Sequence, residues 1–299
     1  MTVLEAIQKS ADFLAKRRVE TPRLQAELLL AHILKVPRMT LYLKFDRSLG
    51  PAETDALREA VRRRGMREPL QHITGSTSFW GHEIRVNRHV LVPRPETELL
   101  AESGWKYLHS VRPGGGCRIL DLCTGSGCIA IAMAAKCPSS MVVATDLSQE
   151  ALDMACQNAV QNGVHERIQF LHGDRFAPLD GMRDKPFDLI LSNPPYIATL
   201  ELATLDPEVR DFDPPMALDG GPDGLGFYRC LAAEAAPFLS VGGKLMVEFG
   251  DGQEEALKEI FSGEKWIVQA VQDDYSQRAR IMILNPPHPV GIGVGGTLG

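Results

Sequence analysis

The chain has 299 residues, of which 44% are hydrophobic and 23% are charged, and its formal net charge at pH 7 is −6. This composition is that of an ordinary globular protein and excludes disordered, collagen-like and coiled-coil chains. No run of residues approaches the 18 consecutive apolar positions of a membrane-spanning helix, and the length predicts one large domain or two unequal ones.

Charge and cysteine positions give a first indication of organisation. Residues 1–90 carry 16 Lys and Arg against 10 Asp and Glu, whereas the remainder carries 16 against 28. A basic front and an acidic back suggest two parts with different roles, although solvated helix faces would give the same surplus. The six cysteines include no C-x-x-C pair, which favours free thiols and argues against a zinc site. With no secretory leader visible, we expect a cytoplasmic protein without a metal ion.

Short helices are predicted in the front third of the chain. One apolar helix face is predicted from residues at three- and four-residue steps, namely Leu4, Ile7, Ala11, Leu14 and Ala15. Thr21-Pro22 is typical of a capped helix start, and another helix is predicted from Pro51 to Gly65. We therefore expect a small helical bundle over residues 1–75, in which Arg62 to Arg64 form a solvated helix end.

Between residues 76 and 98 the pattern changes, and we predict a β-hairpin linker. The hairpin is predicted from Phe79-Trp80-Gly81 and from the alternating residues that follow, Ile84, Val86, Val90 and Val92. A new helix is predicted from Leu99, with Thr97 or a neighbour as its cap. Glu96 and Glu98 fit either an acidic first helix turn or a place in a cofactor pocket.

From Cys117 onward strands and helices alternate, which predicts a doubly wound, mostly parallel α/β sheet. The predicted strands are residues 119–122, 141–145, 168–171, 187–191, 245–249, 266–271 and 281–284, and the clearest helices are 129–135 and 152–160. We assign this second domain to residues 99–285. The Pro- and Gly-rich residues 286–299 are predicted to be a disordered tail.

The first indication of a ligand is the segment from Asp121 to Gly127, D-L-C-T-G-S-G, where a predicted strand meets a helix. Its glycines allow a tight turn and let a ligand approach the main chain. Asp146 ends the next strand, where a carboxylate can accept hydrogen bonds from both ribose hydroxyls. Gly125, Gly127 and Ala130 also fit a dinucleotide fingerprint. However, the turn lies far from the chain start and is more typical of the turn that holds S-adenosylmethionine.

The second indication is Asn193-Pro194-Pro195-Tyr196, which follows an apolar run directly. Prolines lack a backbone donor, so nearby carbonyls stay free as acceptors. An Asn side-chain oxygen beside such a carbonyl would clamp a planar NH₂ group, and the Tyr ring can pack over a flat substrate. The alternative interpretation is a rigid loop exit with a satisfied Asn.

These motifs resemble a known family. The N-P-P-Y signature marks class I methyltransferases acting on planar nitrogen, which include adenine-specific DNA methyltransferases and protein glutamine methyltransferases. Three segments together are similar to the peptide chain release factor glutamine methyltransferases (PrmC/HemK): Val86–Glu98, Leu120–Gly127 and Ser192–Ile197. Further matches are Glu208–Arg210 and Ala217–Gly224. The resemblance covers about residues 24–284, and it implies a Rossmann-like class I methyltransferase domain behind a helical domain that docks the release factor.

The resemblance also implies an activity and residue roles. The enzyme would methylate the side-chain amide nitrogen of the glutamine in the Gly-Gly-Gln motif of release factors, with S-adenosyl-L-methionine as donor, and so support translation termination. Cofactor-binding residues would be Cys123, Thr124, Gly125, Ser126 and Gly127 for the methionine part, Asp146 for the ribose, Asp174 and Arg175 beside the adenine, and Asn193. Substrate-binding residues would be Asn193, Pro194, Pro195 and Tyr196, of which Asn193, Pro194 and Tyr196 would be catalytic.

Three departures from the family pattern affect these roles. Cys123 stands where many members have Gly, and Arg175 stands where an aromatic or apolar residue often covers the adenine. An Arg side chain can still stack on that ring. Near the C-terminus, Gln277–Arg280 replaces a more usual G-R-D-R, which weakens any role assigned to that segment.

Two other classes of function were weighed. A nucleic-acid adenine methyltransferase would need a basic, aromatic-rich target domain, and the acidic larger part argues against one. A binding module without turnover would not need every residue of both motifs, yet all are present. We therefore expect a monomeric enzyme whose partner is a release factor rather than DNA or a membrane.

Overall fold

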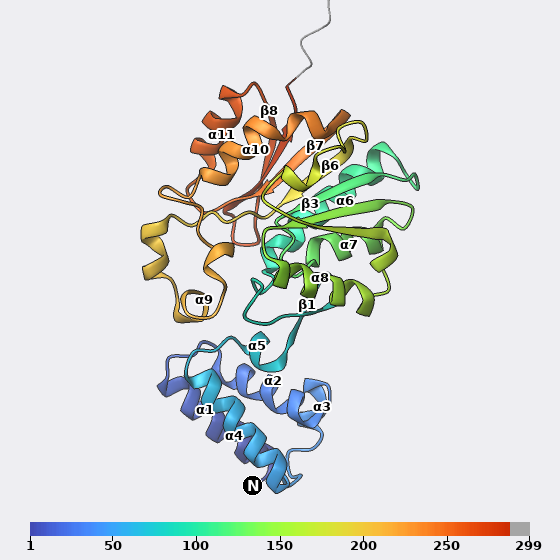
Figure 1. Ribbon diagram of the computed structural model, residues 1–299. Helices are drawn as coiled ribbons and strands as arrows, with labels where there is room; N and C mark the ends of the chain where they lie inside the picture. Colours follow the sequence, from blue (N-terminus) through green and yellow to red (C-terminus); the bar gives the residue numbers. More distant parts are fainter. Residues whose placement is uncertain (288–299) are drawn as a thin grey trace, which may run out of the picture. The chain divides into compact units, whose positions relative to one another are not determined.

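The computed structural model describes residues 1–287 and divides into two compact units (Figure 1). The first unit comprises residues 1–77, 86–88 and 203–213, and the second comprises residues 78–85, 89–202 and 214 onward. Of the predicted tail, residues 288–299 lie outside the described part. No helix within residues 1–287 combines the length and the hydrophobicity that crossing a bilayer requires.

The first unit is helical. Its elements in chain order are α1 (Val3–Lys16), α2 (Pro22–Leu34), α3 (Arg38–Tyr42), α4 (Pro51–Gly65) and α5 (Leu70–Thr74). A capping box starts α1: the Glu5 backbone N–H donates to the Thr2 hydroxyl at 3.2 Å, and the Thr2 N–H donates to the Glu5 carboxylate at 3.0 Å. The helices enclose an apolar core built from α1, α2 and α4, which includes Ile7, Leu14 and Leu29.

Two details of the first unit differ from the sequence prediction. The apolar face of α1 begins at Val3, and Leu4 is 44% exposed, so the predicted face was displaced toward solvent at its start. Pro22 does open α2, but Thr21 adopts a positive φ of 44° and its side chain makes no capping bond. In that left-handed conformation the hydroxyl does not reach the first helical N–H groups.

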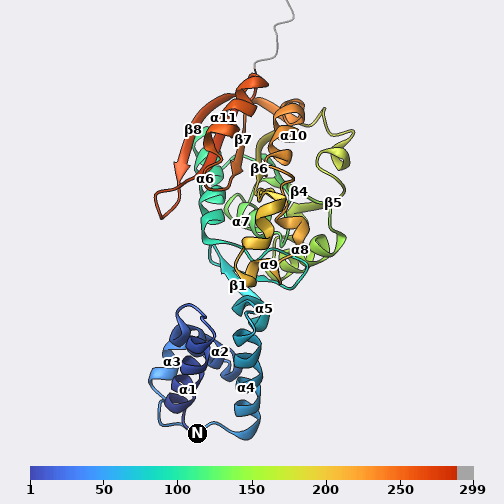
Figure 2. The same ribbon diagram turned by 90° about the vertical axis from the view of Figure 1, so that its left-hand side faces the viewer.

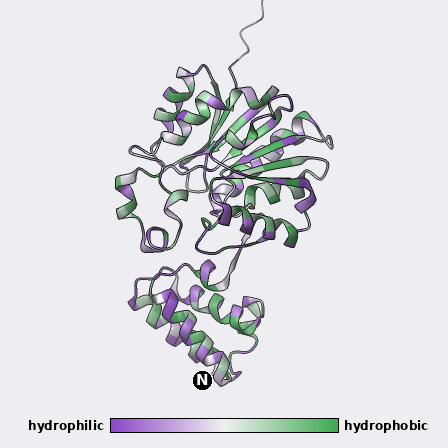
Figure 3. Ribbon diagram, in the orientation of Figure 1, coloured by the Kyte–Doolittle hydropathy of each residue, from purple (hydrophilic) through white to green (hydrophobic). Residues whose placement is uncertain are grey.

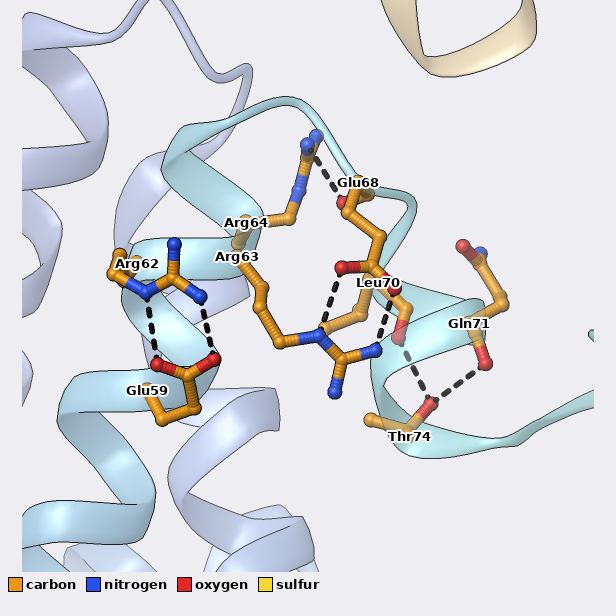
Figure 4. A network of polar contacts seen from close by, with 8 residues as sticks. All are labelled: Glu59, Arg62, Arg63, Arg64, Glu68, Leu70, Gln71 and Thr74. Atoms are coloured by element: carbon orange, nitrogen blue, oxygen red, sulfur yellow. Dashed lines mark hydrogen bonds and ion pairs between the residues drawn. The ribbon is translucent and has the colours of Figure 1, made fainter. Parts of the chain in front are cut away.

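The corner between α4 and α5 is held by arginines (Figure 4). Arg63 donates two hydrogen bonds to the Glu68 carboxylate, at 2.8 and 2.5 Å. Arg64 is only 5% exposed and donates to the Gln25 side chain at 2.8 Å and to the Glu68 carbonyl at 3.2 Å. The predicted solvated helix end is therefore wrong for Arg64, because its guanidinium is buried among acceptors.

Residues 203–213 belong to the first unit, although the chain on both sides of them belongs to the second. Helix α9 (Pro207–Arg210) brings Glu208 to the arginines of α4. The Glu208 carboxylate pairs with Arg64 at 2.8 Å and with Arg67 at 2.5 Å. Burial opposes ionisation of Glu208, but the hydrogen bonds from Arg67 and Arg64 prevail and lower its pKa. The segment Glu208–Arg210, one of those on which the family resemblance rests, thus pairs with arginines of the helical unit.

A seven-stranded sheet forms the centre of the second unit, with the order β5-β4-β3-β6-β7-β9-β8. The strands are β3 (Arg118–Leu122), β4 (Met141–Asp146), β5 (Ile168–His172), β6 (Phe187–Ser192), β7 (Leu239–Glu248), β8 (Ile267–Asp273) and β9 (Ala279–Asn285). The first five strands in this order are parallel, and β9 is antiparallel to both of its neighbours. This confirms the predicted doubly wound α/β fold, whose topological switch point lies between β3 and β6.

Helices cover both faces of the sheet (Figures 1 and 2). They are α6 (Pro95–Val111), α7 (Cys128–Lys136), α8 (Gln149–Gln161), α10 (Gly226–Glu234) and α11 (Glu254–Gly263). One face packs against α10 and α11 through Leu120, Ile190 and Leu245, and α6, α7 and α8 cover the other. Strands buried on both faces read as continuous apolar runs, which explains their hydrophobic colour in Figure 3. Short 3₁₀ helices lie in the connections: η1 (His165–Arg167), η2 (Ala177–Leu179), η3 (Thr199–Thr204), η4 (Pro215–Ala217) and η5 (Ala236–Phe238).

The linker is partly as predicted. β1 (Ser76–Phe79) and β2 (His82–Arg85) pair in a two-stranded sheet, which confirms a hairpin around Trp80. β2 ends at Arg85, however, so the apolar alternation that continues to Val92 is irregular chain. α6 begins at Pro95 rather than Leu99, because proline is well suited to a first helical turn. Thr97 consequently lies inside that turn and does not cap the helix.

Candidate active site

The Gly-rich turn connects β3 to α7 at the carboxyl edge of the sheet. Cys123, Gly125 and Gly127 all have positive φ, at 65°, 54° and 80°. A Cβ on Gly127 would lie 2.9 Å from the Cβ of Ala155 on α8, so only glycine fits there. A Cβ on Gly125 would meet open space, so the main chain of the turn is accessible to a ligand. The left-handed conformation of Cys123 explains why glycine is favoured at this position.

Asp121, the penultimate residue of β3, forms hydrogen bonds that hold the Gly-rich turn. Its Oδ2 atom accepts hydrogen bonds from the Thr124 hydroxyl at 2.6 Å and from the Ala130 backbone N–H at 3.0 Å. Its Oδ1 atom is buried and has no partner within residues 1–287. Burial raises the pKa of Asp121 to about 7. The carboxyl group therefore shapes the turn and titrates near neutral pH.

Asp146, at the end of β4, lies beside the turn. Its Oδ2 atom accepts from the Gly125 N–H at 2.8 Å, and its Oδ1 atom accepts from the Ser148 N–H at 2.9 Å. Burial raises the pKa of Asp146, although these backbone bonds act in the opposite direction. The two carboxylate oxygens together offer about four acceptor positions, so the group keeps capacity for a hydroxyl group besides its backbone bonds.

Asp174 and Arg175 follow β5, farther along the same sheet edge, and both side chains are exposed. The Arg175 guanidinium lies 3.4 Å from the Asp174 carboxylate. The neighbouring Cys230 thiol of α10 raises the pKa of Arg175. The aromatic residue of this segment is Phe176, which is buried and stacks on Phe238 at 5.1 Å between ring centroids. The arginine, and not the aromatic ring, therefore remains on the surface.

The N-P-P-Y loop begins directly after β6, at the switch point of the sheet. The Ser192 hydroxyl donates to the Leu122 carbonyl at 2.8 Å and so joins the ends of β6 and β3. The Asn193 Nδ2 atom donates to the Thr97 hydroxyl of α6 at 3.1 Å. In the described part of the chain, neither Asn193 Oδ1 nor the Pro194 carbonyl accepts a hydrogen bond. These two adjacent oxygens are the candidate acceptors of the loop, although Pro194 itself is a buried residue.

The backbone of Tyr196 is fixed by a hydrogen bond from a side chain that follows β7. The Gln253 Nε2 atom donates to the Tyr196 carbonyl at 2.8 Å, while the Gln253 Oε1 atom accepts from the Gly250 N–H at 2.9 Å. Burial raises the pKa of Tyr196 to about 12, so the phenol stays neutral. The family-like segment Ala217–Gly224 runs alongside the loop, with the Ile197 N–H donating to the Leu218 carbonyl at 2.9 Å.

Sequence reasoning missed one residue of this region, Glu248. It ends β7 and is 1% exposed, and its carboxylate is hydrogen-bonded by Thr97. Burial raises the pKa of Glu248 to about 7. The available signal was a carboxylate at the end of the apolar run that continues into Phe249, where a charged residue needs a specific reason to be buried. Thr97 had been considered only as a helix cap.

The sheet register brings the two motifs together. Leu122 pairs with Ser192 and also with Thr145, so the Gly-rich turn, the N-P-P-Y loop and Asp146 leave neighbouring strands at the same level. Asp174 and Arg175 leave the sheet one strand beyond Asp146. A cavity of about 210 Å³ lined by Cys117 and Ser140 lies at the opposite, amino-terminal edge of the strands and is separate from this site.

The chain matches two described families. Residues 5–75 match the PrmC N-terminal domain, and residues 107–205 match the Methyltransferase small domain. The chain is 42% identical over 261 residues to the release factor glutamine methyltransferase of Geobacter sulfurreducens. The match covers 87% of this chain and 88% of the relative. The corresponding enzyme of Chlorobaculum tepidum is 41% identical over 276 residues, covering 91% of this chain and 93% of the relative.

Solved structures resemble the fold at lower identity. A methyltransferase from Pyrococcus furiosus is 21% identical with a TM-score of 0.51, and the match covers 75% of this chain and 97% of that one. The human Mettl16 catalytic domain, solved with an RNA hairpin, is 16% identical with a TM-score of 0.52, covering 68% and 75%. At these identities the likeness shows a class I methyltransferase fold.

Proposed function

The chain belongs to the family of release factor glutamine methyltransferases, and we propose that the glutamine it methylates is that of the Gly-Gly-Gln motif. It is an S-adenosylmethionine-dependent methyltransferase that acts on release factors. The observation that carries the residue-level proposal is the Asn193 amide, whose Nδ2 atom donates to Thr97 while its Oδ1 atom and the neighbouring Pro194 carbonyl accept no bond in the described part of the chain. A side-chain oxygen and a carbonyl oxygen on adjacent residues can accept the two N–H bonds of one primary amide.

The residues beside the Gly-rich turn fit S-adenosylmethionine. The main chain at Gly125 is open, and the Asp146 carboxylate keeps acceptor capacity suited to a ribose hydroxyl. In this proposal Cys123 to Gly127 hold the methionine part, with Asp174 and Arg175 beside the adenine. When bound, the cofactor supplies an electrophilic methyl carbon on a sulfonium. The pairing of Arg175 with Asp174 favours an edge position for Arg175 over a stacked one.

Alignment is the main task of the protein, because an amide nitrogen is a poor nucleophile whose lone pair is shared with its carbonyl. Asn193 Oδ1 and the Pro194 carbonyl accept the two N–H bonds of the substrate amide and fix its plane. The same two oxygens favour the positive charge that develops on nitrogen during transfer. Pro195 keeps the loop rigid, and the neutral Tyr196 ring packs against the flat amide.

A dedicated base is not required in this scheme. The segment Asn193 to Tyr196 contains no His or carboxylate, and the phenol of Tyr196 has a pKa raised by burial to about 12. After transfer the nitrogen is strongly acidic, so its proton leaves to water. The rate then depends on preorganised acceptors rather than on a titrating side chain within the loop.

We also propose that the enzyme works as a monomer in the cytoplasm and that the helical first unit helps to dock the release factor rather than DNA. The match of residues 5–75 to a domain specific to this family supports the docking role. The charge of the chain supports the exclusion of DNA, since residues 91–299 carry 28 acidic against 16 basic residues.

The test is methyl transfer from labelled S-adenosylmethionine to three substrates: a purified release factor, the same factor with the glutamine of its Gly-Gly-Gln motif changed, and duplex DNA. We expect label on the unchanged factor alone. Label on the changed factor would show that another residue is methylated. Label on DNA would move the substrate assignment to adenine.

A further inference from the structure

The Oδ1 and Nδ2 atoms of the Asn193 side chain are nearly equal in size. Asn193 and Pro194 can accept the two N–H bonds of the substrate amide, an arrangement called the clamp below, only if Oδ1 faces the substrate. With Oδ1 outward the amide accepts a substrate N–H, whereas with Nδ2 outward it presents donors to a donor. Backbone geometry alone does not distinguish the two orientations. The orientation must therefore be set by the group that faces the inner end of the amide.

That group is the Thr97 hydroxyl, which accepts from Asn193 Nδ2 at 3.1 Å. A hydroxyl can either donate to or accept from an amide, so Thr97 by itself would permit both orientations. The Thr97 hydroxyl is also hydrogen-bonded to the Glu248 carboxylate. An ionised carboxylate can only accept hydrogen bonds, so the Thr97 hydroxyl uses its one proton to donate to Glu248. Toward Asn193 the Thr97 oxygen can then act only as an acceptor. The three side chains then form a chain of hydrogen bonds with one direction.

The burial of Glu248 supports a specific role. Thr97 is 2% exposed, and the Glu248 Oε2 atom is buried without a partner in the described part of the chain. Buried carboxylates are normally paired fully, because an unsatisfied one is destabilising. Arg280 lies near but directs its NH1 to the Phe249 carbonyl at 2.9 Å and its NH2 to Asp274 at 3.4 Å. The charges of Arg280 and Arg94 favour the ionised form of Glu248 but do not outweigh its burial, which raises its pKa.

We propose that Glu248, acting through Thr97, is a positioning residue that holds the Asn193 amide with Oδ1 toward the substrate. The proposal rests on the proposed function of Asn193 as an acceptor of the substrate amide. Neither Thr97 nor Glu248 touches the reacting atoms. The segment Arg94–Glu98, which contains Thr97, thereby acquires a role in the reaction.

Protonation of Glu248 gives the carboxyl an O–H of its own, which removes the fixed direction of the chain. Burial raises the pKa of Glu248 to about 7, so this change falls within a measurable range. The other charged or titratable groups that act on Glu248 or are affected by it are Arg94 and Glu96 at the start of α6, Cys128 of α7, Tyr228 of α10, Arg280 of β9 and Tyr196 of the loop. The rate of methyl transfer should therefore fall as the pH falls through about 7.

The test compares four variants of the full chain: Thr97→Val, Thr97→Ser, Glu248→Gln and Ser103→Ala. Thr97→Val keeps the shape and removes the hydroxyl, and we expect its kcat with a release factor to fall at least about tenfold while the Kd for the cofactor stays within about twofold. Thr97→Ser restores the hydroxyl and should recover most of the rate. Ser103→Ala removes a hydroxyl on the same helix that bonds Gln272 and should leave the rate unchanged. Glu248→Gln has no carboxyl group to protonate at this position, so its rate of methyl transfer should no longer fall as the pH drops below about 7.

A second readout does not depend on the substrate. The side-chain NH₂ protons of Asn193, assigned by their absence from Asn193→Ala, should exchange slowly in the parent protein and rapidly in Thr97→Val. A kcat of Thr97→Val within twofold of the parent, or equal damage by Thr97→Ser, would overturn the positioning role. If the parent methylates no release factor, the proposed function fails, and the exchange of these protons alone then decides whether the positioning role stands.

Discussion

Replacing Asp121 by Asn should change how the stability of the protein depends on pH. Asp121 is fully buried, and burial raises its pKa from 3.8 to about 7. A raised carboxyl pKa means that the folded state favours the protonated form. The stabilising contribution is therefore complete below pH 3.8 and is lost as the pH rises through about 7.

The magnitude follows from the two pKa values. A pKa of about 7 against 3.8 corresponds to a total loss of about 4 kcal/mol once the pH exceeds both values, at about 1.4 kcal/mol for each pH unit. Roughly half of that loss, about 2 kcal/mol, falls between about pH 5.5 and pH 8.5. Asp121→Asn has no charge to gain, so the free energy of unfolding of the variant should improve relative to the parent by about 2 kcal/mol over this range.

Urea denaturation of the cofactor-free protein at these two pH values measures the difference. Thr124→Val is a matched variant of opposite sign, because the Thr124 hydroxyl bond lowers the pKa of Asp121. Its loss of stability with rising pH should exceed that of the parent. A difference between Asp121→Asn and the parent that is the same at both pH values would refute the assignment of a neutral buried Asp121.

Three further substitutions have defined outcomes. Gly127→Ala places a Cβ 2.9 Å from Ala155 at a φ of 80°, so the affinity for S-adenosylmethionine in calorimetric titration should fall at least about tenfold; unchanged affinity would show that the turn can relax. Glu208→Ala leaves the buried Arg64 without its carboxylate partner and should lower the free energy of unfolding in urea by roughly 2 kcal/mol, and a neutral result would contradict the role given to α9. Tyr228→Phe removes a buried bond to the Glu248 carbonyl at 2.8 Å and should cost about 1 kcal/mol of stability, whereas a change in the Kd for the cofactor is not expected.

Most of the second unit could be predicted from sequence because its central strands, such as β3 and β6, are buried on both faces and stand out as apolar runs. The run from Phe187 to Ser192 is one example: every residue of it is buried. The two motifs proposed to bind ligands stand out for the same reason, since each begins where such a run ends. The parallel register then places those ends at one edge of the sheet.

The errors came from features that a local pattern does not contain. Val86 to Val92 alternate like a strand, but no partner strand continues beside them after Arg85, so they form irregular chain. Residues 203–213 carry no local sign that they pack with the helical unit, since the contact depends on Glu208 meeting arginines about 140 residues earlier. Glu248 was missed because its partner Thr97 lies far away in sequence.

The residue-level roles in cofactor and substrate binding remain predictions that the geometry supports. Asn193 bears most directly on them, because its Oδ1 atom is one of the two proposed acceptors for the substrate amide. Removing it tests whether preorganised acceptors drive the reaction, without altering the Gly-rich turn or Asp146.

The most direct measurement is single-turnover methyl transfer to a release factor by Asn193→Ala beside the parent, with S-adenosylmethionine and the factor both saturating. The clamp predicts a loss on the order of 2–4 kcal/mol in transition-state stabilisation, or roughly 30- to 1000-fold in rate. A rate within a factor of two of the parent would contradict it.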